Sequence, residues 1–407
     1  MVDVRPFRAF RPPPNLAAAV ASPPYDVVST AEARALAAGN ALSFLHVSRP
    51  EIDLPEGTDE HADEVYARGA RNLTAFVADG TLVQDGEPHL YVYAQKMGDH
   101  RQVGVVACAS VADYTADRIK KHETTRPDKE DDRTRHIEEL GAHDEPVFLT
   151  YRARTAIDAA VGAVMAVPPV YDITTADGVE HRLWVLSRGA TDDLARMFGD
   201  VDALYVADGH HRSAAAERVH KKLAGDGREH DVFLAVIFPH DQMKILPYNR
   251  LVRDRKGRDA ATLVAAIGAT LDVEPAKDAA DATPRQRGHF GVYAAGRWYR
   301  ARARAGSFDA ADPVGALDCS VCQTQILSAI FGIDDPRRDK DVDFVGGIRG
   351  TAELERRVDS SEFQLAIHLH PTSVDELIRV SDAGLLMPPK STWFEPKLKS
   401  GLFLHAF

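Results

Sequence analysis

The segment Asp208-Gly209-His210-His211-Arg212 combines residue types that suit phosphate binding. It lies between a predicted strand and a predicted helix. Glycine permits a turn that most residues resist, and the N–H groups at a helix start bind anions. Imidazole and guanidinium groups add donors, and the planar guanidinium matches phosphate geometry. The predicted phosphate-binding residues are Gly209, His210, His211, Arg212 and Ser213, and Asp208 is predicted to act in catalysis or to hold a metal ion.

A second segment, residues 120–126, gathers Lys, His, Glu, Thr and Arg in one short stretch. Glu123, flanked by cations and by His122, is expected to stay ionised and to accept a hydroxyl proton within its reach. We predict that Glu123 and His122 are catalytic, and that Lys121 and Arg126 contact the substrate.

A third segment near the end of the chain offers lysines and hydroxyls together with backbone donors. This combination suits a phosphorylated ligand, although an ordered tail with solvated lysines explains the segment equally well. The predicted substrate contacts here are Lys390, Ser391, Thr392 and Lys397.

Other kinds of site fit the sequence less well. His210 and His211 are adjacent and lack the HExxH spacing of a zinc site. The glycine-rich residues 346–350 lack the lysine of a P-loop and are predicted to form a turn. Cys319 and Cys322 form a single CxxC in a stretch of helical periodicity, so two core cysteines are favoured over a redox pair or half of a zinc site.

Composition narrows the range of partners. The chain has 407 residues, 44% of them hydrophobic, and a formal net charge of -12. This length predicts two or three domains. A nucleic-acid partner is not expected, because no basic block stands out. The N-terminus lacks a signal-peptide pattern and the longest apolar runs have strand length, which predicts a cytoplasmic protein without a membrane partner.

Hydrophobic periodicity predicts alternating strands and helices. Helices are expected at 64–79, 192–200 and 213–224, and strands at 89–95, 101–111, 145–153, 203–207 and 230–239. Hairpins are expected over 173–187 and around Ala295-Gly296. Strand 203–207, helix 213–224 and strand 230–239 together resemble a βαβ unit. The charged stretch after Pro127 is expected to be a helix capped by Thr124 or Thr125, and with only Ile137 and Leu140 apolar it is typical of a solvated surface helix.

Four segments resemble the signature motifs of a widespread bacterial family of unknown function, across essentially the whole chain. They read ASPPYDVV from Ala21, IKKHETTRPDKEDDR from Ile119, YVADGHHRSAAAERV from Tyr205 and LLMPPKSTWFEPKLKSGLFLH from Leu385. Three of them are also similar, in the same order, to motifs of the archaeal free serine kinases, which belong to the ParB/sulfiredoxin superfamily. Those motifs read Lys-Pro-His-Glu, Asp-Gly-His-His-Arg and Ser-Pro-Lys-Thr-Thr.

This resemblance implies an α/β fold with mixed sheets, built on a ParB/sulfiredoxin-like core. The expected parts are an N-terminal α/β region (1–110), the nucleotide-binding core (111–250), a C-terminal α/β domain (251–383) and a tail returning to the active site (384–407). The N-terminal region has no counterpart in the kinase. Sulfiredoxin has a cysteine where His210 stands, so its chemistry is not expected here.

The resemblance also implies a small-molecule kinase or phosphotransferase. ADP or ATP would exchange a phosphoryl group with a small hydroxyl metabolite in the presence of Mg²⁺, most simply free serine or phosphoserine, with the direction open. Glu123 matches the kinase's base and Asp208 a catalytic aspartate. Two alternatives stay open: a phosphoserine-type phosphatase, and a non-enzymatic nucleotide-sensing module. The sequence does not predict the oligomeric state.

Overall fold

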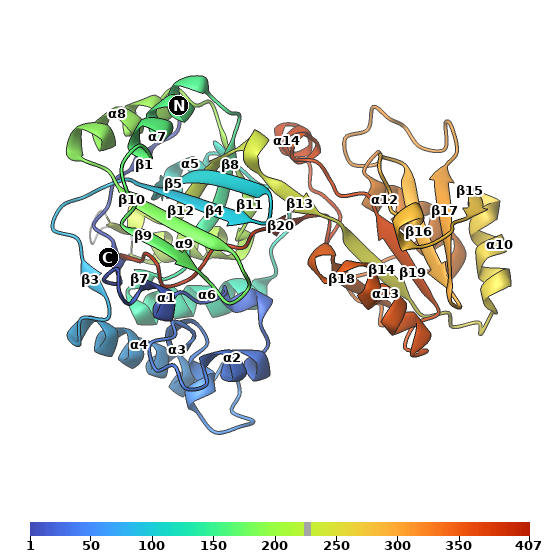
Figure 1. Ribbon diagram of the computed structural model, residues 1–407, viewed down its shortest axis with the longest axis horizontal. Coiled ribbons are helices and arrows are strands. Elements are labelled where there is room, and N and C mark those ends of the chain that lie inside the picture. The colour runs from blue at the N-terminus through green and yellow to red at the C-terminus, as the bar shows by residue number, and fades with distance from the viewer. Residues whose placement is uncertain (224–228) are drawn as a thin grey trace. The chain divides into compact units, whose positions relative to one another are not determined.

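The computed structural model describes residues 1–223 and 229–407, which form two compact units. The first unit comprises Met1–Lys121, Thr125–Met243 and Pro396–Phe407, and the second comprises His122–Thr124 and Lys244–Glu395. The predicted tail 384–407 is thus shared between the units. Each unit is a mixture of helices and sheets (Figure 1), which confirms the predicted fold class, while the ParB/sulfiredoxin-like core and the four-part division stay predictions.

The first unit is built on a nine-stranded mixed sheet in the order β6-β11-β8-β12-β5-β4-β10-β9, with β1 paired to β5. All eight residues of β12 are buried, as expected for a central strand covered on both faces. The strands are β1 (Val4–Arg5), β4 (Tyr91–Met97), β5 (His100–Ser110), β6 (Ile119–Lys120), β8 (Val147–Tyr151), β9 (Tyr171–Thr174), β10 (Glu180–Val185), β11 (Leu204–Asp208) and β12 (Val232–Pro239).

The predicted βαβ-like unit is wrong. Strand β8 lies between β11 and β12, antiparallel to the first and parallel to the second, so β11 and β12 run in opposite directions. Strand β8 comes from an earlier part of the chain, and pairing over such a distance leaves no local sequence signal. The predicted hairpin of β9 and β10 is confirmed.

Helices cover this sheet in two groups. Ile157, Leu194 and Phe198 of α7 and α8 pack into the main core, and Ile137 of α6 packs against Val219 of α9. The helices of the first unit are α1 (Ala17–Val20), α2 (Thr30–Ala37), α3 (Leu45–Ser48), α4 (Asp63–Ala78), α5 (Val111–Thr115), α6 (Pro127–Leu140), α7 (Thr155–Val164), α8 (Arg188–Phe198) and α9 (His210–Leu223). Position 224, the end of the predicted helix 213–224, lies outside the described residues.

The charged helix α6 differs from its prediction in two respects. Its N-cap is Arg126, without a side-chain cap, and Pro127 is its first residue. It also buries a polar stripe rather than lying solvated. The buried polar side chains have partners: Arg133 Nη2 lies 2.9 Å from Asp132, and His136 Nε2 lies 3.1 Å from Asp144. Burying a charged or polar group costs much less free energy when the group is paired than when it is isolated.

Two small sheets tie the chain ends to the first unit. Strand β2 (Phe10–Arg11) pairs with β3 (Val83–Gln84), and β21 (His405–Ala406) pairs antiparallel with β7 (Ala142–His143). The C-terminal residues are therefore an integral part of this unit.

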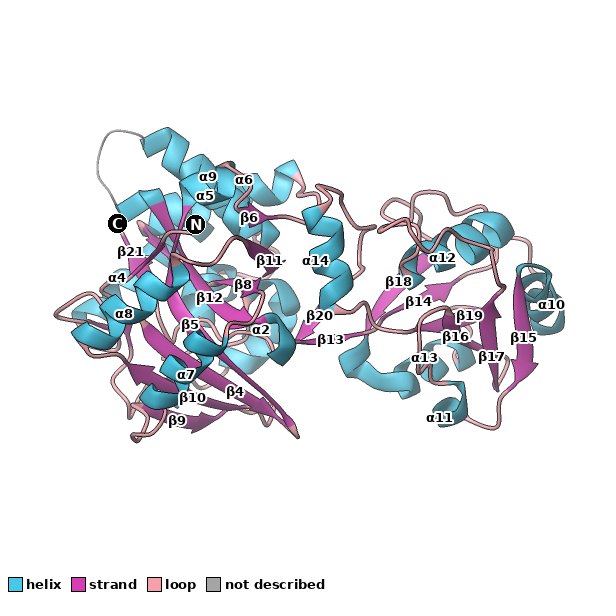
Figure 2. Cartoon of the chain, turned by 90° about the horizontal axis from the view of Figure 1, so that it is seen from above, coloured by secondary structure: helices cyan, strands magenta, loops and turns pink. Residues whose placement is uncertain are grey.

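The second unit contains a six-stranded antiparallel sheet in the order β15-β17-β16-β19-β14-β18, with α10 beside β15 (Figure 2). The predicted hairpin at Ala295-Gly296 is confirmed. Cys319 and Cys322 are free and buried, as predicted for core cysteines. Its elements are β13 (Lys244–Leu246), β14 (Tyr248–Val252), α10 (Ala260–Thr270), β15 (Leu271–Pro275), α11 (Ala279–Ala282), β16 (His289–Ala294), β17 (Arg297–Ala303), α12 (Asp318–Cys322), β18 (Val342–Gly346), α13 (Gly350–Asp359), β19 (Leu365–Leu369), α14 (Val374–Asp382) and β20 (Trp393–Glu395).

Within the described residues, every helix is too short or too polar to cross a lipid bilayer. The cytoplasmic location stays a prediction.

Candidate active site

The segment around Gly209 connects the end of β11 to the start of α9. Gly209 has a φ of +95°, and a Cβ atom there would lie 3.0 Å from Nε of Arg212. Both facts favour glycine at this position. Helix α9 begins at His210, earlier than the predicted start at Ser213, so the two histidines belong to the first helical turn rather than to a loop. The N–H groups of a first turn lack intrahelical acceptors and sit at the positive end of the helix dipole.

Asp208 is held by neighbouring donors. Its Oδ1 accepts a hydrogen bond from Gly209 N at 2.9 Å, and its Oδ2 lies 3.1 Å from Nζ of Lys397. Burial alone would raise the pKa of Asp208, but the charges of Lys397 and Arg212 outweigh it and hold this pKa well below its usual value. Asp208 is therefore ionised, and both of its oxygens are engaged.

The guanidinium of Arg212 is buried and contacts other protein groups instead of being exposed to a phosphate ligand. Its side chain is 8% exposed, and Nη2 lies 3.7 Å from Asp26 and 3.8 Å from Asp208. Nη1 donates to the backbone carbonyl of Pro146, whereas Nε has no hydrogen-bond partner. Arg212 thus joins three segments that are far apart in the sequence, and this geometry does not support its predicted direct contact with phosphate.

Two further predicted phosphate contacts have different outcomes. Ser213 is fully buried, and its hydroxyl donates to the carbonyl oxygens of Gly209 and His210, so the structure does not offer it to a ligand. Nε2 of His211 accepts a hydrogen bond from the backbone N–H of Arg126 at 3.1 Å. Since Nε2 accepts, Nδ1 carries the proton and is the donor atom of this ring. Burial lowers the pKa of His211, which favours this neutral form.

The last residues of the chain complete this side of the site. Lys397, predicted as a substrate contact, reaches Asp208, and its carbonyl accepts a hydrogen bond from Gln95 at 2.9 Å. Three residues on, Ser400 Oγ donates to Glu145 at 2.7 Å. Gly401 has a φ of +84°, and a Cβ atom there would lie 2.6 Å from Cβ of Phe44. These contacts fix Lys397, Ser400 and Gly401 within the first unit.

Sequence reasoning assigned no role to Tyr25, Arg133 or Glu145, which form a buried group beside Arg212. Oε1 of Glu145 accepts a hydrogen bond from Tyr25 N at 3.0 Å, and the guanidinium of Arg133 lies 3.9 Å from the centre of the Tyr25 ring. Burial and the charge of Asp144 raise the pKa of Glu145 to about 7. The only sequence signal was that Tyr25 and Arg133 fall within two of the quoted motif segments.

In the second unit, the segment containing Lys390 is held from several sides. Arg250, a buried cation, donates from Nη2 to Lys390 O at 3.1 Å. Ser391 is buried, and its Oγ donates to Pro388 O at 2.6 Å, so its predicted role as a substrate contact is not supported. Lys390 has a φ of +59°, and its ammonium lies 5.5 Å from the centre of the Tyr248 ring.

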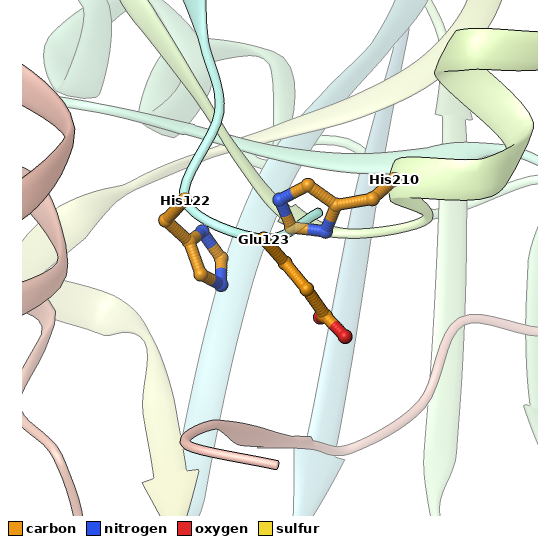
Figure 3. Close-up of side chains that lie close together, drawn as sticks. All are labelled: His122, Glu123 and His210. Carbon is orange, nitrogen blue, oxygen red and sulfur yellow. The ribbon is translucent and has the colours of Figure 1, made fainter. Parts of the chain in front are cut away.

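His122 belongs to the same unit as this segment. Its Nε2 lies 3.4 Å from Oγ1 of Thr392, and its carbonyl accepts a hydrogen bond from Met387 N at 2.8 Å. His122 and Glu123 are drawn with His210 in Figure 3. His122 and Glu123 lie on a three-residue link, which leaves the first unit after Lys121 and returns to it at Thr125.

Both flanks of this link are fixed to the β11–α9 segment. Lys120 in β6 pairs with Tyr205 in β11, and the N–H of Arg126 bonds to His211. The two predicted substrate contacts on these flanks have local partners: the ammonium of Lys121 lies 4.1 Å from the centre of the Tyr114 ring, and Arg126 pairs with Asp128 at 2.7 Å.

The sequence matches the family described as "Protein of unknown function (DUF1015)" over residues 4–320. The chain belongs to this family. A search of curated proteins found no match for this DUF1015 protein.

The solved structures to which the DUF1015 chain is distantly similar include the following three. A conserved hypothetical protein from Pyrococcus furiosus is 13% identical, with a TM-score of 0.35, over 74% of this chain and 95% of the other. A free serine kinase in complex with AMP is 13% identical, with a TM-score of 0.36, over 74% and 92%. A C-terminally truncated SbnI from Staphylococcus aureus is 13% identical, with a TM-score of 0.37, over 72% and 85%. These scores are too low to support a shared mechanism.

Proposed function

We propose that this DUF1015 protein is a phosphotransferase that exchanges a phosphoryl group between a nucleotide and a small hydroxyl metabolite, with free serine or phosphoserine as the first candidate. The observation that carries the proposal is that the segment holding Glu123 is anchored on both sides to the segment that starts α9. Lys120 is paired with β11, and Arg126 is bonded to His211.

The spacing of these anchors limits how far Glu123 can move. Each extended residue spans at most about 3.6 Å, and Glu123 is three residues from either anchor. A base on this link therefore stays within about 11 Å of the anchored backbone, close enough for a long side chain to serve a hydroxyl bound at the helix start. We propose that Glu123 is this base.

The start of α9 is the proposed phosphate site. First-turn N–H groups and the positive end of the helix dipole favour an anion there, and Nδ1–H of His211 adds a donor. Lys397 neutralises Asp208 beside this site. We assign Arg212 to holding this arrangement from behind.

In the proposed reaction, the acceptor hydroxyl attacks the terminal phosphorus of the nucleotide. Glu123 takes the proton of the acceptor hydroxyl, and the hydroxyl oxygen forms a bond to the terminal phosphorus of the nucleotide. The bond from that phosphorus to its bridging oxygen breaks, and the nucleotide leaves one phosphate shorter. Such a transfer depends mainly on positioning and charge neutralisation. The reverse reaction would use the same groups.

Magnesium usually accompanies nucleotide phosphates and binds oxygen ligands. Asp208 fits this role poorly, because Gly209 and Lys397 engage its two oxygens. This geometry therefore does not support the prediction that Asp208 holds the metal ion.

The test is a phosphoryl-exchange assay on the full chain. Radiolabelled serine is incubated with ATP or ADP and magnesium, and phosphoserine with ADP or AMP, for the wild type and for Glu123→Gln. The matched control is Glu139→Gln, because Glu139 is an exposed glutamate on α6. We expect Glu123→Gln to lose exchange by at least about 100-fold, the usual contribution of a general base, with Glu139→Gln unaffected.

Three other outcomes would contradict the proposal. Release of phosphate from phosphoserine without nucleotide would indicate the phosphatase. Tight nucleotide binding without turnover on any hydroxyl acceptor would indicate the sensing module. Equal activity of Glu123→Gln and wild type would remove the proposed base.

A further inference from the structure

A cluster of metal-binding residue types lies at the opposite end of α9 from the candidate active site. One ligand atom from each of His220, His230 and Asp231 lies within 4.8 Å of the other two. His220 is in the last turn of α9, and the other two residues belong to the 3-10 helix η3 (Glu229–Asp231) that precedes β12. We propose that these three residues bind a divalent transition-metal ion, with zinc as the first candidate. This inference does not depend on the proposed function.

The hydrogen bond of His230 prepares its ring for a metal. His230 is buried, and its Nε2 lies 2.9 Å from the carbonyl oxygen of Leu223. A carbonyl can only accept, so Nε2 carries the proton and Nδ1 presents its lone pair. Metal-bound histidines characteristically donate the second ring N–H to a carbonyl or carboxylate in this way, which fixes both tautomer and orientation.

The geometry around His220 also favours an ion. Its Nδ1 lies 3.1 Å from Oδ1 of Asp231, yet this buried nitrogen makes no hydrogen bond. Bonds of about 2.0–2.1 Å in a tetrahedral arrangement place ligand atoms about 3.4 Å apart. The observed separation is close to this value, and an ion between the two atoms would satisfy the nitrogen that the pair leaves without a hydrogen bond.

The ligand types select the metal. Two imidazoles and one carboxylate suit zinc and its neighbours in the transition series, whereas magnesium and calcium prefer sites built from oxygen. Three protein ligands leave a fourth position for water. The nearby acidic residue Glu229 is directed elsewhere, since its Oε2 lies 2.9 Å from Nε2 of His405.

Such an ion would fix the end of α9 to the start of β12. The same helix carries the candidate phosphate site at its first turn, so the ion would stabilise the element on which that site is built. Because metal binds the folded site, zinc is expected to raise the melting temperature.

The experiment measures zinc and cobalt binding to the chelator-treated full chain. We expect one equivalent of Zn²⁺ per chain by calorimetry, a visible Co²⁺ spectrum that Zn²⁺ abolishes, and a rise in Tm with Zn²⁺. His220→Gln and Asp231→Asn, both at partly exposed positions, should each weaken Zn²⁺ binding by at least about 10-fold, with far-UV circular dichroism confirming that they fold.

Two controls separate this site from others. His61 Nδ1 lies 3.2 Å from Asp132 in a similar pair, but the described residues supply no third ligand there, so His61→Gln should bind zinc as the wild type does. Glu123→Gln should also keep zinc binding, which distinguishes this site from the proposed active site. The inference is overturned if the wild type binds no zinc, or if His220→Gln and Asp231→Asn bind it as tightly as the wild type.

Discussion

Glu145 is a buried carboxyl whose protonation should control the stability of the first unit. Its Oε1 accepts hydrogen bonds from Tyr25 N and Ser400 Oγ, while Oε2 is buried without a partner. Burial and the charge of Asp144 raise its pKa to about 7, against the attraction of Arg212. The protonated form therefore dominates in the folded protein under mildly acidic conditions.

The sign of the effect follows from the two pKa values. Below about pH 4.5, the ordinary value for glutamate, folded and unfolded chains both carry the proton and the contribution of Glu145 is fully present. Between pH 4.5 and about 7 only the folded chain holds it, so stability falls as pH rises. At 1.36 kcal/mol for each pH unit, the loss amounts to about 3 kcal/mol.

The substitution that isolates this effect is Glu145→Gln. Glutamine keeps an oxygen for Tyr25 and Ser400 but never ionises, so its contribution does not vary with pH. We expect the free energy of unfolding of the wild type to decline relative to that of Glu145→Gln by about 3 kcal/mol between pH 4.5 and 8. Urea denaturation of both proteins at half-unit steps of pH measures the difference, and other titrating groups cancel.

Parallel pH profiles of the two proteins would refute this reasoning. They would mean that Arg212 compensates the buried charge and that Glu145 titrates normally. A difference that grows in the opposite direction, with the wild type gaining stability as pH rises, would show that the ionised carboxylate is the preferred partner of this site.

Three more substitutions test the geometry of the site. Gly209→Ala should destabilise the protein by about 1–2 kcal/mol in urea, because its φ of +95° disfavours a Cβ atom, and an undiminished stability would contradict the observed turn. Lys397→Met should raise the pKa of Asp208 and lower the free energy of unfolding by about 1–3 kcal/mol. This cost is smaller than for a fully buried pair because both side chains are partly exposed. In a protein that already carries Asp208→Asn, Lys397→Met should cost no further stability. Gly401→Ala should cost about 2 kcal/mol or more, because its Cβ atom would overlap Phe44, and a wild-type Tm would disprove that contact.

Local sequence patterns were sufficient for the local elements. The turn at Ala295-Gly296 was predictable because alternating apolar residues flank it on both sides, and the structure has the hairpin there. Strand β12 was predictable because it is a continuous apolar run. The hairpin and strand β12 are both determined by residues that are adjacent in the chain, and hydrophobic periodicity reveals such local structure.

Non-local pairing was not predictable in this way. Strand β8 enters the sheet between β11 and β12, although helix α9 connects those two strands in the sequence. Helix α6 read as a solvated helix because only Ile137 and Leu140 are apolar, yet it buries charged residues whose partners include Tyr66 and Asp144 from other segments. A single sequence does not show which distant partner will neutralise a charge.

The same reasoning explains why residue type alone misplaced part of the site. Arg212, beside two histidines at a helix start, has the chemistry of a phosphate ligand, but its guanidinium is occupied by Asp26, Asp208 and the carbonyl of Pro146. Asp26 is distant in the sequence, so no spacing rule could have shown this pairing. A buried arginine in such a position fixes the loop, and in the proposed function direct contact with the phosphates falls to His211 and to the N–H groups at the start of α9. Because Arg212 is assigned to positioning the loop, Arg212→Lys should weaken nucleotide binding and lower stability together. Loss of a residue that contacts the nucleotide directly would weaken binding alone.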